Sequence, residues 1–278
     1  MKKNLKIMVV SSKGGVGKST VSMQLLTPYL FEYNNKKAIS YYEFDDENND
    51  CLSYGDSKLT KREIVEVSSS ILRDKITEII SKDETACFDV GGNKTTTMVL
   101  DAMAESGMVY FIDLVVIPLL DGEQDGINAS VIYSIIKGIN PEQKILFVLN
   151  RAKNTKYLHY QFDNFFGDVR GIFKDTYSIK NYLFDDDHQQ YIAMIDDDII
   201  KYSRRFGLTI YELAQKKQDF KKLLKQKKGD ISHEQEVKLH SFKNYIQKAS
   251  SSYFKDVLQP SYEKIDLILE QENDNKTT

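Results

Sequence analysis

The chain has 278 residues, of which 41% are hydrophobic and 28% charged, and its formal net charge is −3. These values suit one large α/β domain or two small ones. The N-terminus lacks the pattern of a secretory signal, and no segment approaches about 18 uncharged apolar residues, so we expect no membrane insertion. Cys51 and Cys87 lack the spacing of a metal or redox site. We therefore expect a cytoplasmic protein with reduced thiols.

Charge is unevenly distributed along the chain. Residues 201–257 contain 14 Lys/Arg and 6 Asp/Glu, so this segment is strongly basic although the whole chain is slightly acidic. A basic segment on an acidic body favours a surface that faces a polyanion. A solvated helix face explains a run of lysines equally well, and both explanations stay open.

Apolar strand-like runs alternate with helical patterns over most of the chain. The predicted strands are Leu5–Val10, Ala38–Phe44, Thr85–Asp89, Phe111–Pro118, Ile145–Asn150 and Tyr191–Ile195. The predicted helices are Lys18–Phe31, Lys61–Ser81, Thr96–Glu105, Gly126–Ile139, Lys156–Phe166, Tyr211–Lys228, Ser232–Val257 and Tyr262–Glu270. This alternation predicts an α/β fold in which a mainly parallel twisted sheet carries helices on both faces. We expect one domain over residues 1–278, with residues 229–278 as a helical C-terminal extension.

A glycine-rich loop lies between the first predicted strand and the first predicted helix. It comprises Lys13, Gly14, Gly15, Val16, Gly17, Lys18 and Ser19, and Thr20 follows it. Strand, loop and helix form the context of a phosphate-binding loop, because backbone N–H groups and the positive end of the helix face one anion. In that geometry Lys18 reaches the β- and γ-phosphates, and the Ser19 hydroxyl holds Mg²⁺. One lysine suffices for one nucleotide, so Lys13 needs a separate explanation.

The loop resembles the deviant phosphate-binding loop of the ParA/MinD family of ATPases, whose pattern is KGGxGK followed by Ser or Thr. The resemblance implies the P-loop NTPase fold and binding of ATP and Mg²⁺ by residues 14–20. It also implies that Lys13 crosses a dimer interface and touches the nucleotide of the other subunit. A solvated lysine is the alternative for Lys13.

Acidic residues end the second and third predicted strands. Asp45 matches the second aspartate of the family's Asp-x-Asp-Pro-Gln segment, so the resemblance implies that it lies near Mg²⁺ and positions the attacking water. Asp89, followed by Gly91 and Gly92, matches the family's Asp-x-Pro-x-Gly switch and would meet Mg²⁺ through water. Both segments lack the family's prolines. A solvated acidic loop and an ordinary strand-to-helix turn remain the alternatives.

Two further polar residues follow predicted strands. Asn150 ends the fifth strand, where the family has an asparagine that pairs with the adenine edge, and an amide can donate and accept at once. Asp121 follows the fourth strand, and it could face Lys13 across a dimer. Each signal is weak alone, because asparagine and aspartate are common where strands end.

The late segment from Ile192 to Glu212 resembles the family's Gly-x-x-Ile-x-Glu region. Basic residues near this region contact the DNA backbone in ParA proteins. The candidates for non-specific DNA contact are therefore Lys201, Arg204, Arg205, Lys221 and Lys222. The three acids of 196–198 stand beside them and more readily cap a helix than bind a metal.

Together the motifs resemble those of a ParA-like partition ATPase of the short form, for which we expect no N-terminal DNA-reading domain. The resemblance implies an ATP-dependent homodimer, slow hydrolysis stimulated by a ParB-like partner protein, and a role in plasmid or chromosome partition. The alternative is a conjugation-associated or MinD-like cargo- or membrane-positioning ATPase that does not act on DNA. The acidic tail 265–272 argues against a membrane-binding helix.

Overall fold

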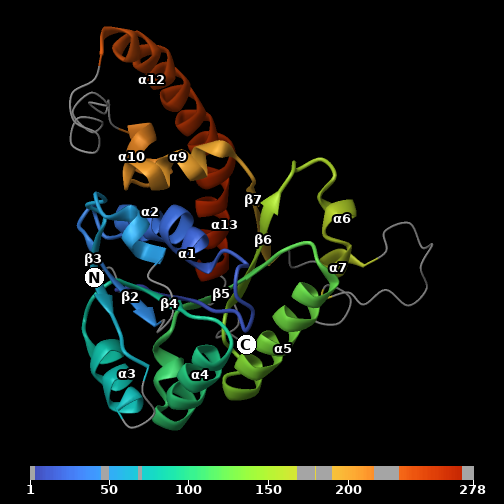
Figure 1. The fold of residues 1–278 in the computed structure, drawn as a ribbon. Coiled ribbons are helices and arrows are strands. Elements are labelled where there is room, and N and C mark those ends of the chain that lie inside the picture. Colours follow the sequence, from blue (N-terminus) through green and yellow to red (C-terminus); the bar gives the residue numbers. More distant parts are fainter. Residues whose placement is uncertain are drawn as a thin grey trace.

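A parallel sheet forms the centre of the molecule. The computed structural model describes residues 4–44, 50–67, 71–167, 179, 190–215 and 232–270. Within them the sheet has seven strands in the order β3-β2-β4-β1-β5-β6-β7 (Figure 1). The strands are β1 Lys6–Val9, β2 Ile39–Phe44, β3 Thr60–Ile64, β4 Ala86–Val90, β5 Leu114–Leu119, β6 Ile145–Ala152 and β7 Tyr191–Ile195. All neighbouring pairs are parallel, so the carboxyl ends of the strands meet at one edge. The predicted α/β fold class is confirmed.

Helices cover both faces of the sheet (Figure 1). The first layer contains α3 Leu72–Ser81, α4 Lys94–Ser106, α5 Glu123–Ile139, α6 Leu158–Gln161 and α7 Asp163–Phe166. The second contains α1 Lys18–Val21, the π-helical η1 Ser22–Leu26, α2 Thr27–Tyr33, α9 Asp198–Phe206, α10 Ile210–Gln215, α12 His233–Tyr253, the π-helical η4 Phe254–Leu258 and α13 Gln259–Glu270. Two 3₁₀ turns, η2 Asp50–Tyr54 and η3 Met108–Phe111, complete the described elements.

The sheet is buried on both faces, and alternate strand residues enter two separate cores. In β1, Met8 packs toward the first helix layer, whereas Ile7 and Val9 pack toward the second. A strand places successive side chains on opposite faces, so a doubly covered strand reads as a continuous apolar run. This explains why the strand before the glycine loop could be recognised in the sequence.

The C-terminal helices pack against the body of the protein. Ser232 and Gln235 form the expected capping box at the start of α12. Ile246, Leu258 and Ile265 are fully buried in the second core, and Tyr253 donates its hydroxyl hydrogen to the Ile195 carbonyl at 2.9 Å. The break expected between Val257 and Tyr262 is absent, because α12 continues through η4 into α13 and Pro260 lies within this continuous helix, next to the π-helical η4. Among the described residues, no helix combines the length and apolarity needed to cross a bilayer.

Several predicted boundaries are wrong. Residues 60–64 form the edge strand β3 instead of the start of a helix, and α3 begins at Leu72. Charged side chains are common both in exposed edge strands and on surface helices, so the sequence pattern did not distinguish the two. The strand expected from Phe111 begins at Leu114, because Gly107 (φ 69°) turns the chain into η3.

The expected helix 156–166 divides into α6 and α7 at Phe162, which leaves helical geometry and is fully buried. The short helix α9 was not among the expected helices, although its cap was foreseen. The carboxylate of Asp197 accepts a hydrogen bond from the Ile199 N–H at 2.8 Å. Only residues 211–215 of the helix expected over 211–228 are described, and they lie in α10.

Candidate nucleotide-binding site

The glycine loop connects β1 to α1 at the carboxyl edge of the sheet. Gly15 and Gly17 adopt positive φ values of 77° and 88°, which favour glycine. No atom lies within 4 Å of a Cβ added at Gly14 or Gly15, so the surface over the loop is open. Gly17 is the N-cap of α1, and no side chain caps the helix there. The first N–H groups of the helix therefore face the loop, which is the donor set that a phosphate group requires.

The side chain of Lys18 points back into the glycine loop. Its side chain is largely buried, and Nζ donates to the Lys13 carbonyl oxygen at 3.3 Å. An ammonium group bonded to the loop's own backbone sits where a phosphate chain wrapped by that loop would lie. The loop and Lys18 thus fit a nucleotide's phosphates by their geometry and by the chemistry of their donors.

Asp89 lies beneath the start of α1, fully buried in β4 beside β1. Its Oδ2 accepts a hydrogen bond from the Tyr41 hydroxyl at 2.6 Å and lies 2.8 Å from Ser22 Oγ. Burial raises the pKa of the Asp89 carboxyl above its ordinary value. The hydrogen bonds from Tyr41, Ser22 and Ser19 and the charge of Lys18 oppose this rise. The structure therefore brings Ser19 and Asp89, two of the three residues predicted to hold Mg²⁺, close to Lys18. Binding of the metal there stays a prediction.

The segment after β4 packs directly on the glycine loop. A Cβ added at Gly92 would lie 3.2 Å from the backbone nitrogen of Gly14. The Asn93 N–H donates to the Ser12 carbonyl at 2.8 Å, and Thr96 Oγ1 donates to the carbonyls of Ser11 and Gly91. The phosphate loop is thus hydrogen-bonded to residues 91–96, where the switch was expected.

Lys13 forms an ion pair within its own subunit. Its Nζ lies 3.0 Å from Oδ2 of Asp125, in the first turn of α5. Asp125 is only 5% exposed, and its other oxygen, Oδ1, has no hydrogen-bond partner. Within this subunit Asp121 accepts a hydrogen bond from Gln161 at 3.1 Å, and its contact with Lys13 across a dimer stays a prediction. The sequence does contain one signal for Asp125, since this acidic residue directly precedes the predicted helix Gly126–Ile139.

Asn150 contacts the glycine loop from β6. Its Nδ2 donates to the Val16 carbonyl at 2.8 Å, and its Oδ1 accepts a hydrogen bond from the Arg151 N–H at 3.0 Å. The side chain is 3% exposed, and a Cβ added at Gly17 would overlap its amide. Asn150 therefore holds the loop in this structure, and its pairing with adenine stays a prediction.

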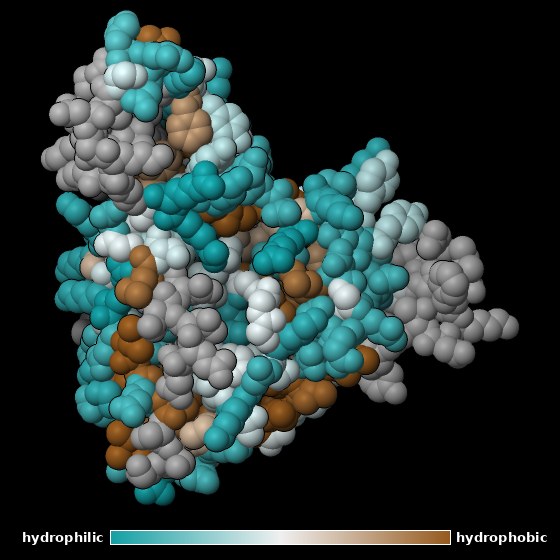
Figure 2. All heavy atoms as spheres, viewed as in Figure 1, coloured by the Kyte–Doolittle hydropathy of each residue, from teal (hydrophilic) through white to brown (hydrophobic). Residues whose placement is uncertain are grey.

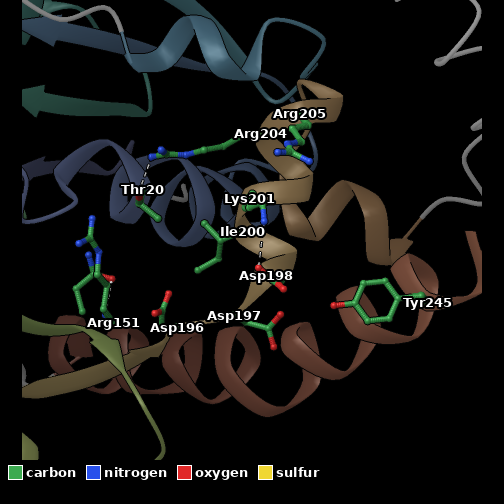
Figure 3. Close-up of a pocket in the computed structure, with 11 residues that line it drawn as sticks. Thr20, Arg151, Asp196, Asp197, Asp198, Ile200, Lys201, Arg204, Arg205 and Tyr245 are labelled. Carbon is green, nitrogen blue, oxygen red and sulfur yellow. Dashed lines mark hydrogen bonds and ion pairs between the residues drawn. The ribbon is translucent and has the colours of Figure 1, made fainter. Parts of the chain in front are cut away.

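A cavity of about 800 Å³ opens beside the loop at the ends of β6 and β7. In Figure 2 the surface between the α9–α12 projection and the side of α6 is hollowed and mostly hydrophilic. Thr20 and Asn150 line the cavity on the loop side, and the residues of α9 and α12 that line it include Lys201, Arg204, Arg205 and Tyr245 (Figure 3). The volume is within the range of small-molecule sites.

The basic residues of α9 face different surroundings. Lys201 and Arg205 are exposed, and Lys201 lies 3.5 Å from Asp198. Arg204 is half-buried and turns toward the loop, where its Nη2 donates to Thr20 Oγ1 at 2.6 Å. This orientation differs from the exposed phosphate contact expected for Arg204. Of the other predicted site residues, Asp45, Lys221 and Lys222 lie outside the described residues.

No protein-family model and no curated protein sequence matches this chain. Among solved structures, apo McdA from Cyanothece aligns with a TM-score of 0.50 and 10% identity over 75% of this chain and 92% of its own. A putative plasmid partition protein from Borrelia burgdorferi bound to AMPPNP gives 0.45 and 12% over 70% and 87%. MinD from Aquifex aeolicus gives 0.46 and 12% over 74% and 88%. The likeness to McdA concerns the fold, and it agrees with the glycine-loop motif. The chain therefore has a P-loop NTPase α/β fold like that of McdA.

Proposed function

We propose that the protein is a Mg²⁺-dependent ATPase that acts as an ATP-controlled dimer switch in partition or positioning of a cargo. The observation that carries this proposal is the glycine loop itself. Its open backbone, its uncapped helix start and the inward Lys18 match the requirements of a triphosphate. The McdA-like fold supports the same conclusion but does not select a cargo.

Each residue around the loop has a proposed task. The N–H groups of residues 14–20 bind the phosphate chain, and Lys18 neutralises its β- and γ-oxygens. Ser19 and Asp89 would hold Mg²⁺, which neutralises the charge that develops on the phosphates. Asp45 follows β2, the neighbour of β4, and by the family resemblance it positions the attacking water. Phosphoryl transfer depends mainly on such positioning and charge stabilisation.

Lys13 supplies the argument for a dimer. In this structure its ammonium group is held by Asp125 of the same subunit. For Lys13 to reach the nucleotide of a second subunit, this ion pair must open. We therefore propose that the separate subunit keeps Lys13 on Asp125, and that ATP-dependent pairing transfers it to the partner's phosphates. Electrostatics favours this transfer, because a triphosphate carries more negative charge than one carboxylate.

DNA is the polyanionic partner that we propose, and two exposed residues of α9 support it. Lys201 and Arg205 lie on the same short helix, and a dimer would double the number of phosphate contacts. A ParB-like protein that stimulates hydrolysis fits the same cycle. A positioning role without DNA remains the alternative, and a conjugation machine or a membrane-associated cargo would then be the partner.

ATP titration tests the proposal directly. The parent protein should bind ATP with Mg²⁺, and Lys18→Ala should remove binding. Lys238→Ala, an exposed lysine of α12, is the matched control and should bind as the parent does. Asp45→Ala should keep ATP binding but abolish turnover, because it removes only the water-positioning group. Normal binding by Lys18→Ala would refute the proposed function.

A further inference from the structure

Arg204 reaches from α9 across to the start of α1. Its Nη2 donates to Thr20 Oγ1 at 2.6 Å, and its Nε donates to the Tyr54 hydroxyl at 3.1 Å. The guanidinium carbon lies 5.8 Å from the centre of the Tyr54 ring. Figure 3 shows the side chain extending across the cavity toward Thr20. Arg204 thus connects three segments that are far apart in the sequence.

A buried polar network fixes the base of this side chain. Tyr54 OH also accepts a hydrogen bond from Gln24 Nε2 at 3.0 Å, and the same nitrogen donates to Ser203 Oγ at 2.6 Å. Gln24 Oε1 accepts a hydrogen bond from the Ile210 N–H at 2.8 Å. Gln24, Tyr54 and Ser203 are fully buried. Because every member is bonded, the network orients Arg204 before any ligand arrives.

Thr20 marks the end of the phosphate site that is nearest to the cavity. Lys18 lies at the inner part of the loop, where the β- and γ-phosphates belong, and Thr20 is two residues further along the helix start. Thr20 also lines the cavity of about 800 Å³. A nucleotide whose β- and γ-phosphates lie at Lys18 and whose nucleoside enters this cavity must pass its α-phosphate beside Thr20.

We propose that Arg204 binds the α-phosphate of the nucleotide and positions it, which rests on the proposed ATPase function. An arginine makes stronger, charge-assisted hydrogen bonds to phosphate oxygens than to hydroxyl groups. The α-phosphate would therefore draw the guanidinium from Thr20 Oγ1 by a small movement. Arg204 is then a nucleotide-binding residue, and Lys201 and Arg205 are the residues of α9 that we propose for DNA contact.

The contact also joins the nucleotide to the segment beyond Asp45. Tyr54 ends η2, the turn that follows residues 45–49 in the chain. An arginine held by both Tyr54 and an α-phosphate would stabilise η2 whenever a nucleotide is bound. This contact is independent of the γ-phosphate, so it should serve ADP and ATP equally.

Titration of fluorescent ATP and ADP analogues with Mg²⁺ tests this assignment. Arg204→Gln should weaken both nucleotides by the same factor, about 10- to 100-fold, the usual effect of losing a charged hydrogen bond. Arg204→Lys should recover part of the loss, because it restores the charge but not the fork of donors. Arg73→Gln, the same change on the exposed face of α3, is the control and should bind both nucleotides as the parent does.

A thermal unfolding scan without nucleotide separates binding from structural damage. Arg204→Gln should have a midpoint lowered only by the loss of its bonds to Tyr54 and Thr20, and it should remain fully folded at the temperature of the titration. The assignment to the α-phosphate is overturned if Arg204→Gln binds both nucleotides within twofold of the parent while Lys18→Ala binds neither. It is also overturned if only ATP binding weakens, because the contact would then involve the γ-phosphate. Retained binding by Lys18→Ala would instead refute the proposed function.

Discussion

The ion pair between Lys13 and Asp125 should contribute measurably to the stability of the separate subunit. Its atoms lie 3.0 Å apart, Lys13 is 41% exposed and Asp125 is 5% exposed. At an effective dielectric constant of about 20, the bare Coulomb attraction is about 5 kcal/mol, and desolvation and side-chain entropy offset most of it. A coupling energy of about 1–2 kcal/mol is expected, between the values for exposed and buried pairs.

A double-mutant cycle measures this coupling by urea unfolding of the nucleotide-free protein. Lys13→Ala should cost about 1–2 kcal/mol, because it leaves a buried carboxylate unpaired. Asp125→Asn should cost less, and the double variant should be about as stable as Asp125→Asn. Lys238→Ala breaks the exposed pair with Glu234 and should cost under about 0.5 kcal/mol.

A coupling energy below about 0.5 kcal/mol, or a Lys13→Ala variant as stable as the parent, would refute a stabilising Lys13–Asp125 ion pair. Either result would mean that Lys13 is a solvated side chain in the separate subunit. The proposal that ATP transfers Lys13 from Asp125 to a partner's phosphates would then lose its starting state.

Three further predictions concern the site and its surroundings. Burial raises the pKa of Asp89, so its ionised form destabilises the fold at pH values above the ordinary carboxyl pKa. Asp89→Asn should therefore raise the unfolding midpoint at about pH 8, and a thermal-shift series should show this gain fading toward about pH 4. Gly17→Ala should lose ATP binding and about 1–3 kcal/mol of stability, because the φ of 88° and the adjacent Asn150 amide exclude a Cβ. Gly138 has open space around a Cβ, so Gly138→Ala should not be destabilised in the same urea titration. In the Asp45→Ala protein with ATP, the double change Lys201→Glu and Arg205→Glu should reduce filter retention of duplex DNA equally for all sequences. The DNA affinity of the protein without this double change should fall with salt, by a log–log slope of about −0.9 per phosphate contacted. If that protein retains no DNA at low salt, a protein cargo is favoured.

The glycine loop could be predicted from the sequence because its signal is local. Three glycines and two lysines fall within seven residues between an apolar run and a helical pattern. The strand β1 and the position of Asp89 follow from the same reasoning, since doubly buried parallel strands are apolar runs that end in the site. The seven-stranded order also agrees with the alternation of strands and helices.

Other features depend on contacts that a sequence does not display. Asp125 pairs with a lysine 112 residues away, and Arg204 bonds Thr20 across 184 residues. A basic run in the sequence indicates charge but not the direction in which each side chain points, so the sequence did not distinguish Arg204 from its exposed neighbour Arg205. The edge strand β3 was missed because its charged residues suit an exposed strand and a helix alike.

The molecular mass of the Asp45→Ala protein with and without ATP tests the dimer switch most directly. This variant should bind ATP without hydrolysing it, so the ATP-bound state persists during light scattering. The expected mass is that of one subunit, 32.1 kDa, without nucleotide and twice that mass with ATP and Mg²⁺. Adding Lys13→Ala should weaken the dimer while leaving ATP binding largely intact. A mass that is the same with and without ATP would contradict the switch.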